Sequence, residues 1–177
     1  MPTFIAIIAI IAILVAAVLI YAASRPDGFR IERSMSIKAA PERIFSLINS
    51  FHQWETWSPW EKVDPEIKRT YNGAESGRGA VYAWQGNKNI GEGRMEIIES
   101  TPNSRLVIKI DFLKPFEAHN TIEFTLEPQG GTTKVTHAMF GRSPFISKLM
   151  GVFWSMDKMV GPKFEEGLAS VKALAEK

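Results

Sequence analysis

The N-terminal segment of the chain is one uninterrupted apolar stretch. It runs from Phe4 to Ala23 and contains no charged or strongly polar side chain. A helix of about 20 residues crosses the roughly 30 Å hydrocarbon core of a bilayer. A core helix with this pattern would need apolar surroundings on every side, which so small a domain does not provide. The pattern therefore predicts a transmembrane anchor over residues 1–24.

After this segment the pattern changes to that of a folded domain. Residues 25–28 form a polar linker with Pro and Gly turn signals. Alternation over residues 29–38 predicts a strand, and Pro41 opens a helical stretch that continues, after a break, to Trp57. Short alternating segments with Gly-bearing turns follow, which predict strands at residues 66–71, 79–84, 90–99, 105–112, 118–127 and 134–141.

The last segment repeats its apolar residues every three or four positions, as an amphipathic helix does. The stripe starts at Phe145 and ends at Leu174. Gly161-Pro162 interrupts it, and because the stripe continues beyond, we expect a kink there. A sheet with one apolar face must cover that face, and only this helix is long enough. We predict one α+β domain over residues 29–177, a curved antiparallel sheet wrapped on a long C-terminal helix.

The charges around the apolar segment indicate whether it is cleaved and how it is oriented in the membrane. A cleavable signal peptide has a basic start and a shorter apolar stretch of roughly 7–15 residues. No Lys or Arg precedes Phe4, so the sequence favours an uncleaved, single-pass anchor. Arg25, Arg30 and Arg33 follow the segment, and the positive-inside rule then places the domain on the cytoplasmic side. A periplasmic or extracellular domain is the alternative, and it goes with the signal-peptide interpretation.

Composition narrows the chemistry. The chain has no cysteine, which excludes disulfides, thiolate catalysis and cysteine metal sites. Its net charge is +2 and its basic residues are scattered, so we expect no nucleic-acid partner. The 3 histidines lack metal-site spacing, and no serine elbow or phosphate loop occurs. These features favour binding over catalysis, without a metal or a cofactor.

Short motifs are spread along the soluble part, from Phe29 to the C-terminus. They are Ala39-Ala40-Pro41-Glu42-Arg43-Ile44-Phe45, Trp54-Glu55-Thr56-Trp57-Ser58-Pro59-Trp60, Tyr71-Asn72-Gly73, Gly79 to Trp84, Gly86-Asn87, Gly91-Glu92-Gly93 and Phe164-Glu165-Glu166-Gly167-Leu168. This set resembles the SRPBCC, or START-like, superfamily, in particular its bacterial polyketide cyclase/dehydrase and lipid-transport proteins. The resemblance implies the helix-grip fold, but not one activity. Similar proteins often carry Trp near the position of His137.

The candidate ligand-binding residues are apolar and aromatic side chains, with one histidine. Trp54 and Trp57 offer flat contact surface to a ligand, or else lock the short helices onto the sheet. His137 lies on an apolar strand face, where it would act as a general base, orient a polar ligand group, or simply be hydrogen-bonded in place. The full set is Trp54, Trp57, Tyr82, Trp84, Ile110, Phe112, Phe124, His137, Met139 and Met156.

Together these features predict a membrane-anchored protein that binds a lipid-like or aromatic, polyketide-like molecule in an internal cavity. Two alternatives stay open. One is a cyclase or dehydratase that uses His137 as its acid/base. The other is a membrane-held interaction module whose interior is filled by its own side chains and which takes no ligand.

Overall fold

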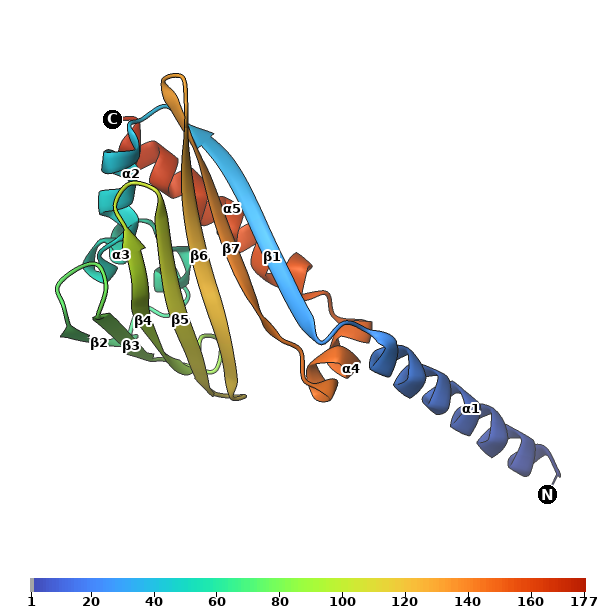
Figure 1. The fold of residues 1–177 in the computed structure, drawn as a ribbon. Helices are drawn as coiled ribbons and strands as arrows, with labels where there is room; N and C mark the ends of the chain where they lie inside the picture. Colours follow the sequence, from blue (N-terminus) through green and yellow to red (C-terminus); the bar gives the residue numbers. More distant parts are fainter. Residues whose placement is uncertain (1) are drawn as a thin grey trace.

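The computed structural model describes residues 2–177. It shows one domain with a helix projecting from it (Figure 1). In chain order the elements are α1 (Pro2–Ser24), β1 (Gly28–Ile37), α2 (Pro41–Ile48), α3 (Phe51–Trp57), the 3-10 helix η1 (Pro59–Lys62), β2 (Lys68–Gly73), β3 (Ala80–Gln85), β4 (Glu92–Thr101), β5 (Arg105–Lys114), β6 (Ala118–Gln129), β7 (Thr132–Arg142), α4 (Phe145–Phe153) and α5 (Met156–Ala175).

The strands form a 7-stranded antiparallel sheet in the order β1-β7-β6-β5-β4-β3-β2. The first strand, β1, therefore forms one edge of the sheet and pairs with the last strand, β7, and the strands from β2 to β7 form a meander. Buried and more exposed residues alternate in β3 and along most of β4, as a sheet with one covered face requires. The predicted α+β architecture is confirmed.

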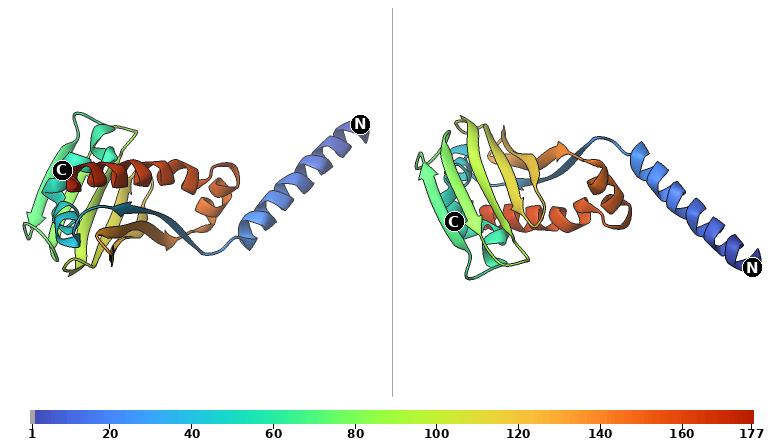
Figure 2. Two further views of the ribbon diagram at one scale, coloured as in Figure 1. Left: turned by 90° about the horizontal axis from the view of Figure 1, so that it is seen from above. Right: turned by 90° about the horizontal axis from the view of Figure 1, so that it is seen from below.

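Helix α5 lies across the covered face of the sheet, and the two short helices α2 and α3 close one end (Figures 1 and 2). The buried apolar residues of α5 follow helical spacing, at Phe164, Leu168, Val171 and Ala175. They meet a core that includes the fully buried Phe124 and Leu106 on the sheet. This is the helix-grip arrangement, with the predicted ligand region between α5 and the sheet.

The C-terminal apolar stripe forms two helices, where the sequence predicted one. The chain leaves the helix at Trp154, which has extended backbone angles, and α5 starts anew after Ser155. The Ser155 hydroxyl accepts a hydrogen bond from the Lys158 amide at 3.4 Å, so it acts as an N-cap. Helix α5 then runs through Pro162. The helix thus continues past Gly161-Pro162, as expected, and the stripe is divided earlier, at the capping Ser155.

Helix α1 carries almost no core contact of its own. Residues Thr3–Ser24 have a mean hydropathy of 3.3, long and apolar enough for a membrane span. Among the described side chains of α1, Ala22 alone is buried, close to α4. Asp27 ties the following linker to the domain: its carbonyl accepts from the Ser143 amide at 2.7 Å and its carboxylate pairs with Lys148.

Candidate functional site

The centre of the site is His137 on β7. Its side chain points inward with those of Val135 and Met139, as two-residue periodicity requires, and it is 6% exposed. The imidazole is stacked between Phe124 of β6 and Phe164 of α5, with ring centroids 4.1 Å and 3.8 Å away. The imidazole thus lies where α5 grips the sheet.

No protein group satisfies this imidazole. Neither Nδ1 nor Nε2 of His137 has a hydrogen-bond partner among the described residues. Burial lowers the pKa of His137 from 6.5 to about 3, so the ring is neutral near pH 7. An unsatisfied buried polar group costs about 1–3 kcal/mol. Such a group in a native core calls for an explanation, and an occupant that forms the missing hydrogen bond is one.

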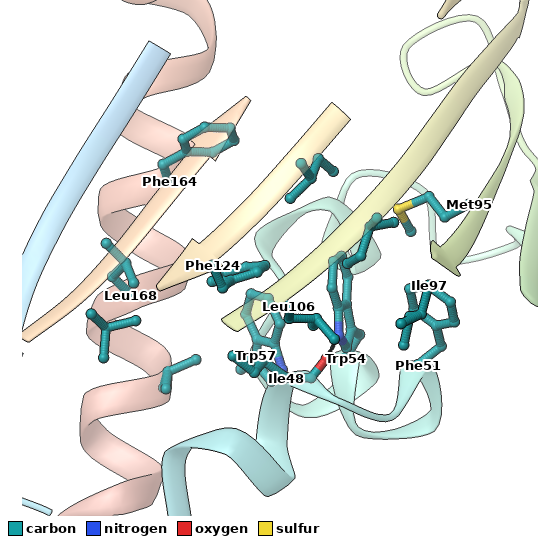
Figure 3. Close-up of a cluster of buried hydrophobic side chains, with 14 of the residues drawn as sticks. Ile48, Phe51, Trp54, Trp57, Met95, Ile97, Leu106, Phe124, Phe164 and Leu168 are labelled. Atoms are coloured by element: carbon teal, nitrogen blue, oxygen red, sulfur yellow. Dashed lines mark hydrogen bonds between the residues drawn. The ribbon is translucent and has the colours of Figure 1, made fainter. Parts of the chain in front are cut away.

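Trp54 and Trp57 form the wall beside Phe124 (Figure 3). Both rings meet Phe124 edge-on, with centroids 6.1 Å and 6.2 Å away. Their indole N–H groups donate to backbone carbonyls of α2, those of Ile48 and Leu47, each at 2.9 Å. Since these donors are already used inside the protein, the two tryptophans fasten α3 to α2, and they present only ring carbons to a neighbour.

Tyr82 and Trp84 lie on β3, which β6, β5 and β4 separate from β7. The Tyr82 hydroxyl donates to Glu61 at 2.7 Å, and the Trp84 indole donates to the Ile90 carbonyl at 3.2 Å. Gly93 on the next strand leaves room for the Trp84 ring, because a Cβ there would overlap it. These two residues therefore belong to a second aromatic group under η1, and not to the surroundings of His137.

Most of the sequence-predicted set is brought into one core. Trp54, Trp57, Tyr82, Trp84, Ile110, Phe124, His137 and Met139 are buried, and Phe112 is partly buried against them. Met156 lies outside the group, with 42% of its surface exposed. It is the first residue of α5, and the helix break before it leaves the first turn of α5 off the sheet.

The rings of Phe124 and Phe164 stack on the two faces of the His137 imidazole and occupy the space beside it. Two hollows of about 390 Å³ and 370 Å³ lie elsewhere. The first is lined by α2, α3 and the loop after β2, including Asn49 and Glu75. The second involves the ends of β1, β6 and β7, including Phe29 and Asn120. Neither is lined by a residue of the predicted set, so a ligand at His137 requires α5 to move.

Arg33 is a residue of this region that the sequence analysis did not single out. It is directly opposite His137 in the β1–β7 register and faces α5. Its guanidinium binds both carboxylate oxygens of Asp157 at 2.9 Å and 3.0 Å, and Glu165 at 2.6 Å. These carboxylates raise the pKa of Arg33. The signal was present in the strand pattern, because Arg33 occupies an inward position between Ile31 and Met35.

The helical segment before Gly161 makes little core. No residue in the described segment Phe145–Val160 is buried, whereas Gly161 and Phe164 are. Arg33 is therefore the main link that we identify between the start of α5 and the sheet. A segment with few buried contacts opens at low free-energy cost. The structure thus combines a loosely held first turn of α5 with a firmly packed remainder from Gly161 onward.

Within the described residues, no group of three or more His, Asp or Glu side chains is placed to hold an ion. His119 binds Asp111 at 2.7 Å, but it lies on the exposed outer side of the sheet. The carboxylates nearest the candidate site, Asp157 and Glu165, are already paired with Arg33.

Comparison with known proteins supports the fold and gives the family. Protein CV1439 from Chromobacterium violaceum is 14% identical, with a TM-score of 0.59 over 86% of this chain and 99% of that one. The Aha1 dimer from Colwellia psychrerythraea is 18% identical, with a TM-score of 0.56 over 84% of this chain and 96% of that one. At this identity the likeness concerns the fold alone.

A third similar structure is the di-domain ARO/CYC StfQ from the steffimycin biosynthetic pathway. It is 10% identical, with a TM-score of 0.60 over 84% of this chain and 51% of that one. No protein of curated function matches the chain. The family described as polyketide cyclase/dehydrase and lipid transport matches residues 28–176. This match covers the whole domain beyond the linker and confirms the resemblance seen in the sequence motifs. The chain belongs to the polyketide cyclase/dehydrase and lipid-transport family.

Proposed function

We propose that this protein binds a hydrophobic small molecule that carries one polar group, and that α1 anchors it in a membrane. The apolar part of the molecule would lie between α5 and the sheet, against Phe124 and Phe164. Its polar group would bond to His137. The ligand class follows from the surroundings, which are aromatic and aliphatic except for the one imidazole.

The observation that carries this proposal is the unsatisfied imidazole. His137 is neutral, so one ring nitrogen donates and the other accepts. A ligand hydroxyl, carbonyl or carboxyl group would pair with at least one of them. That bond would recover part of the cost of about 1–3 kcal/mol that the empty protein carries for an unsatisfied polar atom. A purely hydrocarbon ligand would not.

The loosely held first turn of α5 supplies a route toward this position. The segment from α4 to Val160 contains no buried residue of its own. Displacing it requires the release of Asp157 from Arg33, an ion pair whose carboxylate is 55% exposed. Exposed ion pairs of this kind contribute little to stability. Opening at this end therefore costs less than separating the packed part of α5, from Gly161 onward, from the sheet.

An enzymatic role for His137 is the second candidate, in line with the family's description. The pKa of about 3 argues against it, because an imidazole with this pKa is a weak base near pH 7. The nearest charged group on the neighbouring strand, Arg33, is held by two carboxylates. A third candidate, an interaction module without a ligand, draws support from the filled interior.

Anchoring and orientation form the second part of the proposal. The length and hydropathy of α1 support a membrane span, and Arg25 after its end supports a cytoplasmic domain. A reporter that is active only after export, fused at Lys177, tests the orientation. An inactive reporter fits the cytoplasmic assignment. An active one would show that the domain crosses the membrane.

A binding titration tests the proposed function. The full chain in mild detergent is titrated with a fluorescent long-chain fatty acid and with a fluorescent alkane of equal length. His137→Leu replaces the imidazole by an apolar side chain of similar size. We expect this change to weaken the affinity for the fatty acid roughly tenfold, the equivalent of about 1.4 kcal/mol, and to leave the affinity for the alkane unchanged. His119→Gln, which changes an imidazole outside the core, is the control. Equal affinities in all three proteins would contradict the proposed role of His137.

A further inference from the structure

A group of exposed apolar side chains covers α4 and the first turn of α5. Each is between 42% and 65% exposed, although most are large enough to be expected in a core. They are Phe145, Ile146, Met150, Phe153, Trp154, Met156 and Met159. A contiguous surface of this kind on a soluble domain marks a contact with a partner or a membrane.

The pattern within α4 is that of a helix lying along an apolar boundary. Ile146, Met150 and Phe153 are spaced by four and three residues, so they form one stripe on the exposed side of α4. Helix α4 has no buried residue among those described. Trp154 follows at its end, and tryptophan, whose apolar ring carries a polar N–H, favours the interface between lipid and water.

The position of α4 decides which partner this surface meets. It lies beside the C-terminal end of α1 (Figure 1). Only residues 25–27 separate Ser24 from β1, a length of about 10 Å when fully extended. Asp27 is itself bound to α4, because its carboxylate pairs with Lys148. Its carbonyl also accepts a hydrogen bond from the amide of Ser143, which lies just before α4. The apolar surface therefore cannot move far from the point where α1 leaves the bilayer.

We propose that α4 and the first turn of α5 lie in the interfacial layer of the bilayer that α1 spans, with Ile146, Met150 and Phe153 inserted among the lipid chains. The inference rests on the membrane span of the proposed function. Lys158 lies among these apolar residues, where its charged end reaches the headgroups. The end of α5 that is free to open faces the membrane, so a hydrophobic ligand would pass between lipid and protein without crossing water.

Single cysteines give a direct test, because the natural chain has none. Ile146→Cys and Phe153→Cys are each spin-labelled in the full chain, reconstituted in vesicles of phosphatidylcholine and phosphatidylglycerol. The collision rates with oxygen and with a water-soluble nickel complex report the depth of the label. Ile11→Cys in α1 is the reference inside the bilayer. Ile98→Cys, which is 44% exposed on β4, is the reference in water.

We expect the labels at positions 146 and 153 to favour oxygen, with values between those of positions 11 and 98 and nearer to position 11. Two labelled sites guard against a variant that fails to fold, which circular dichroism would reveal. If both labels match position 98 while position 11 lies in the bilayer, the inference is wrong and the anchor stands. If position 11 is also in water, the anchor fails too. Spin–spin broadening that disappears on dilution with unlabelled protein would identify a second copy as the partner and overturn the proposal.

Discussion

Gly161 of α5 lies directly beneath the guanidinium group of Arg33, so close that a Cβ at position 161 would overlap Nη2. The two carboxylates that Arg33 binds, Asp157 and Glu165, precede and follow Gly161 by four residues each. They therefore lie one turn away on either side, on the same helix face. Because Gly161 has no side chain, the surface of α5 has a depression there, in which Arg33 of β1 crosses the helix.

The first prediction concerns this depression. Gly161→Ala would displace the guanidinium of Arg33, the end of a flexible side chain, from its two carboxylates, so we expect this variant to be less stable than a Gly→Ala change elsewhere in a helix by about 1 kcal/mol. Gly151→Ala in α4 is the matched control, since a Cβ there meets nothing within 4 Å. We expect the control to be neutral or stabilising by up to about 1 kcal/mol. Urea unfolding of the full chain in detergent, followed by tryptophan fluorescence, measures both. Equal stability of the two variants would contradict the role given to Gly161.

The second prediction concerns the loosely held first turn of α5. Arg33→Met removes the ion pairs and keeps the inward apolar stem, so amide exchange should rise roughly tenfold over residues 156–160 and stay unchanged in β5. Arg105→Met is the control, because Arg105 binds Glu123 and Glu99 on the other face of the sheet. Mass spectrometry of exchanged peptides gives the comparison. Protection at residues 156–160 that Arg33→Met does not alter would mean that other contacts hold this end.

The third prediction concerns pH. His137 titrates near 6.5 when unfolded and at about 3 when folded, so the unfolded state binds the extra proton below pH 6.5. Stability is then lost as the pH falls from about 6.5, by at most about 1.4 kcal/mol per pH unit. Exposed carboxylates add their own dependence only below about pH 5. His137→Phe should abolish the decline between pH 6.5 and about 5, measured as Tm in detergent.

A control of opposite sign is available for this pH series. Asp111 raises the pKa of His119, so the stabilisation from that pair is present below pH 6.5 and is lost as the pH rises through the raised pKa. His119→Gln should therefore destabilise the protein on the acid side and leave the decline due to His137 intact. A decline that persists unchanged in His137→Phe would show that the imidazole is protonated or solvated in the folded protein.

The fourth prediction treats α1 as separable from the domain. Because Ala22 alone among the described side chains of α1 is buried, removal of residues 1–24 should leave a cooperatively folding protein. We expect this truncated protein to bind vesicles through α4. Loss of cooperative unfolding would refute the division into anchor and domain. Folding without vesicle binding would instead show that α4 needs α1 to reach the membrane.

The sequence predicted the fold well, because strand alternation and helical stripes report directly which face of each element is buried. It also placed His137 correctly on the inner face. It did not locate the division at Ser155, since a capping serine within an apolar stripe is a weaker signal than a proline. The sequence could not show that Gly161 accommodates Arg33. That relation joins residues far apart in the chain and depends on where β1 and α5 meet.

The expected cavity shows a different limit of sequence reasoning. Apolar residues directed toward one another, such as Phe124 and Phe164, give the same pattern whether they line a space or fill it. The indole partners of Trp54 and Trp57 decide between contact with a ligand and internal fastening, and these partners are backbone carbonyls that no side-chain pattern reveals.

Native mass spectrometry of the full chain, released from its own membranes in mild detergent, tests the central claim most directly. We predict a population that carries one hydrophobic molecule with a polar group, identified by fragmentation. This population should be depleted in His137→Leu and retained in His119→Gln. A wild-type protein that is free of ligand, and that stays so after incubation with the lipid extract of the same membranes, would contradict the claim. It would favour the interaction module with a filled interior.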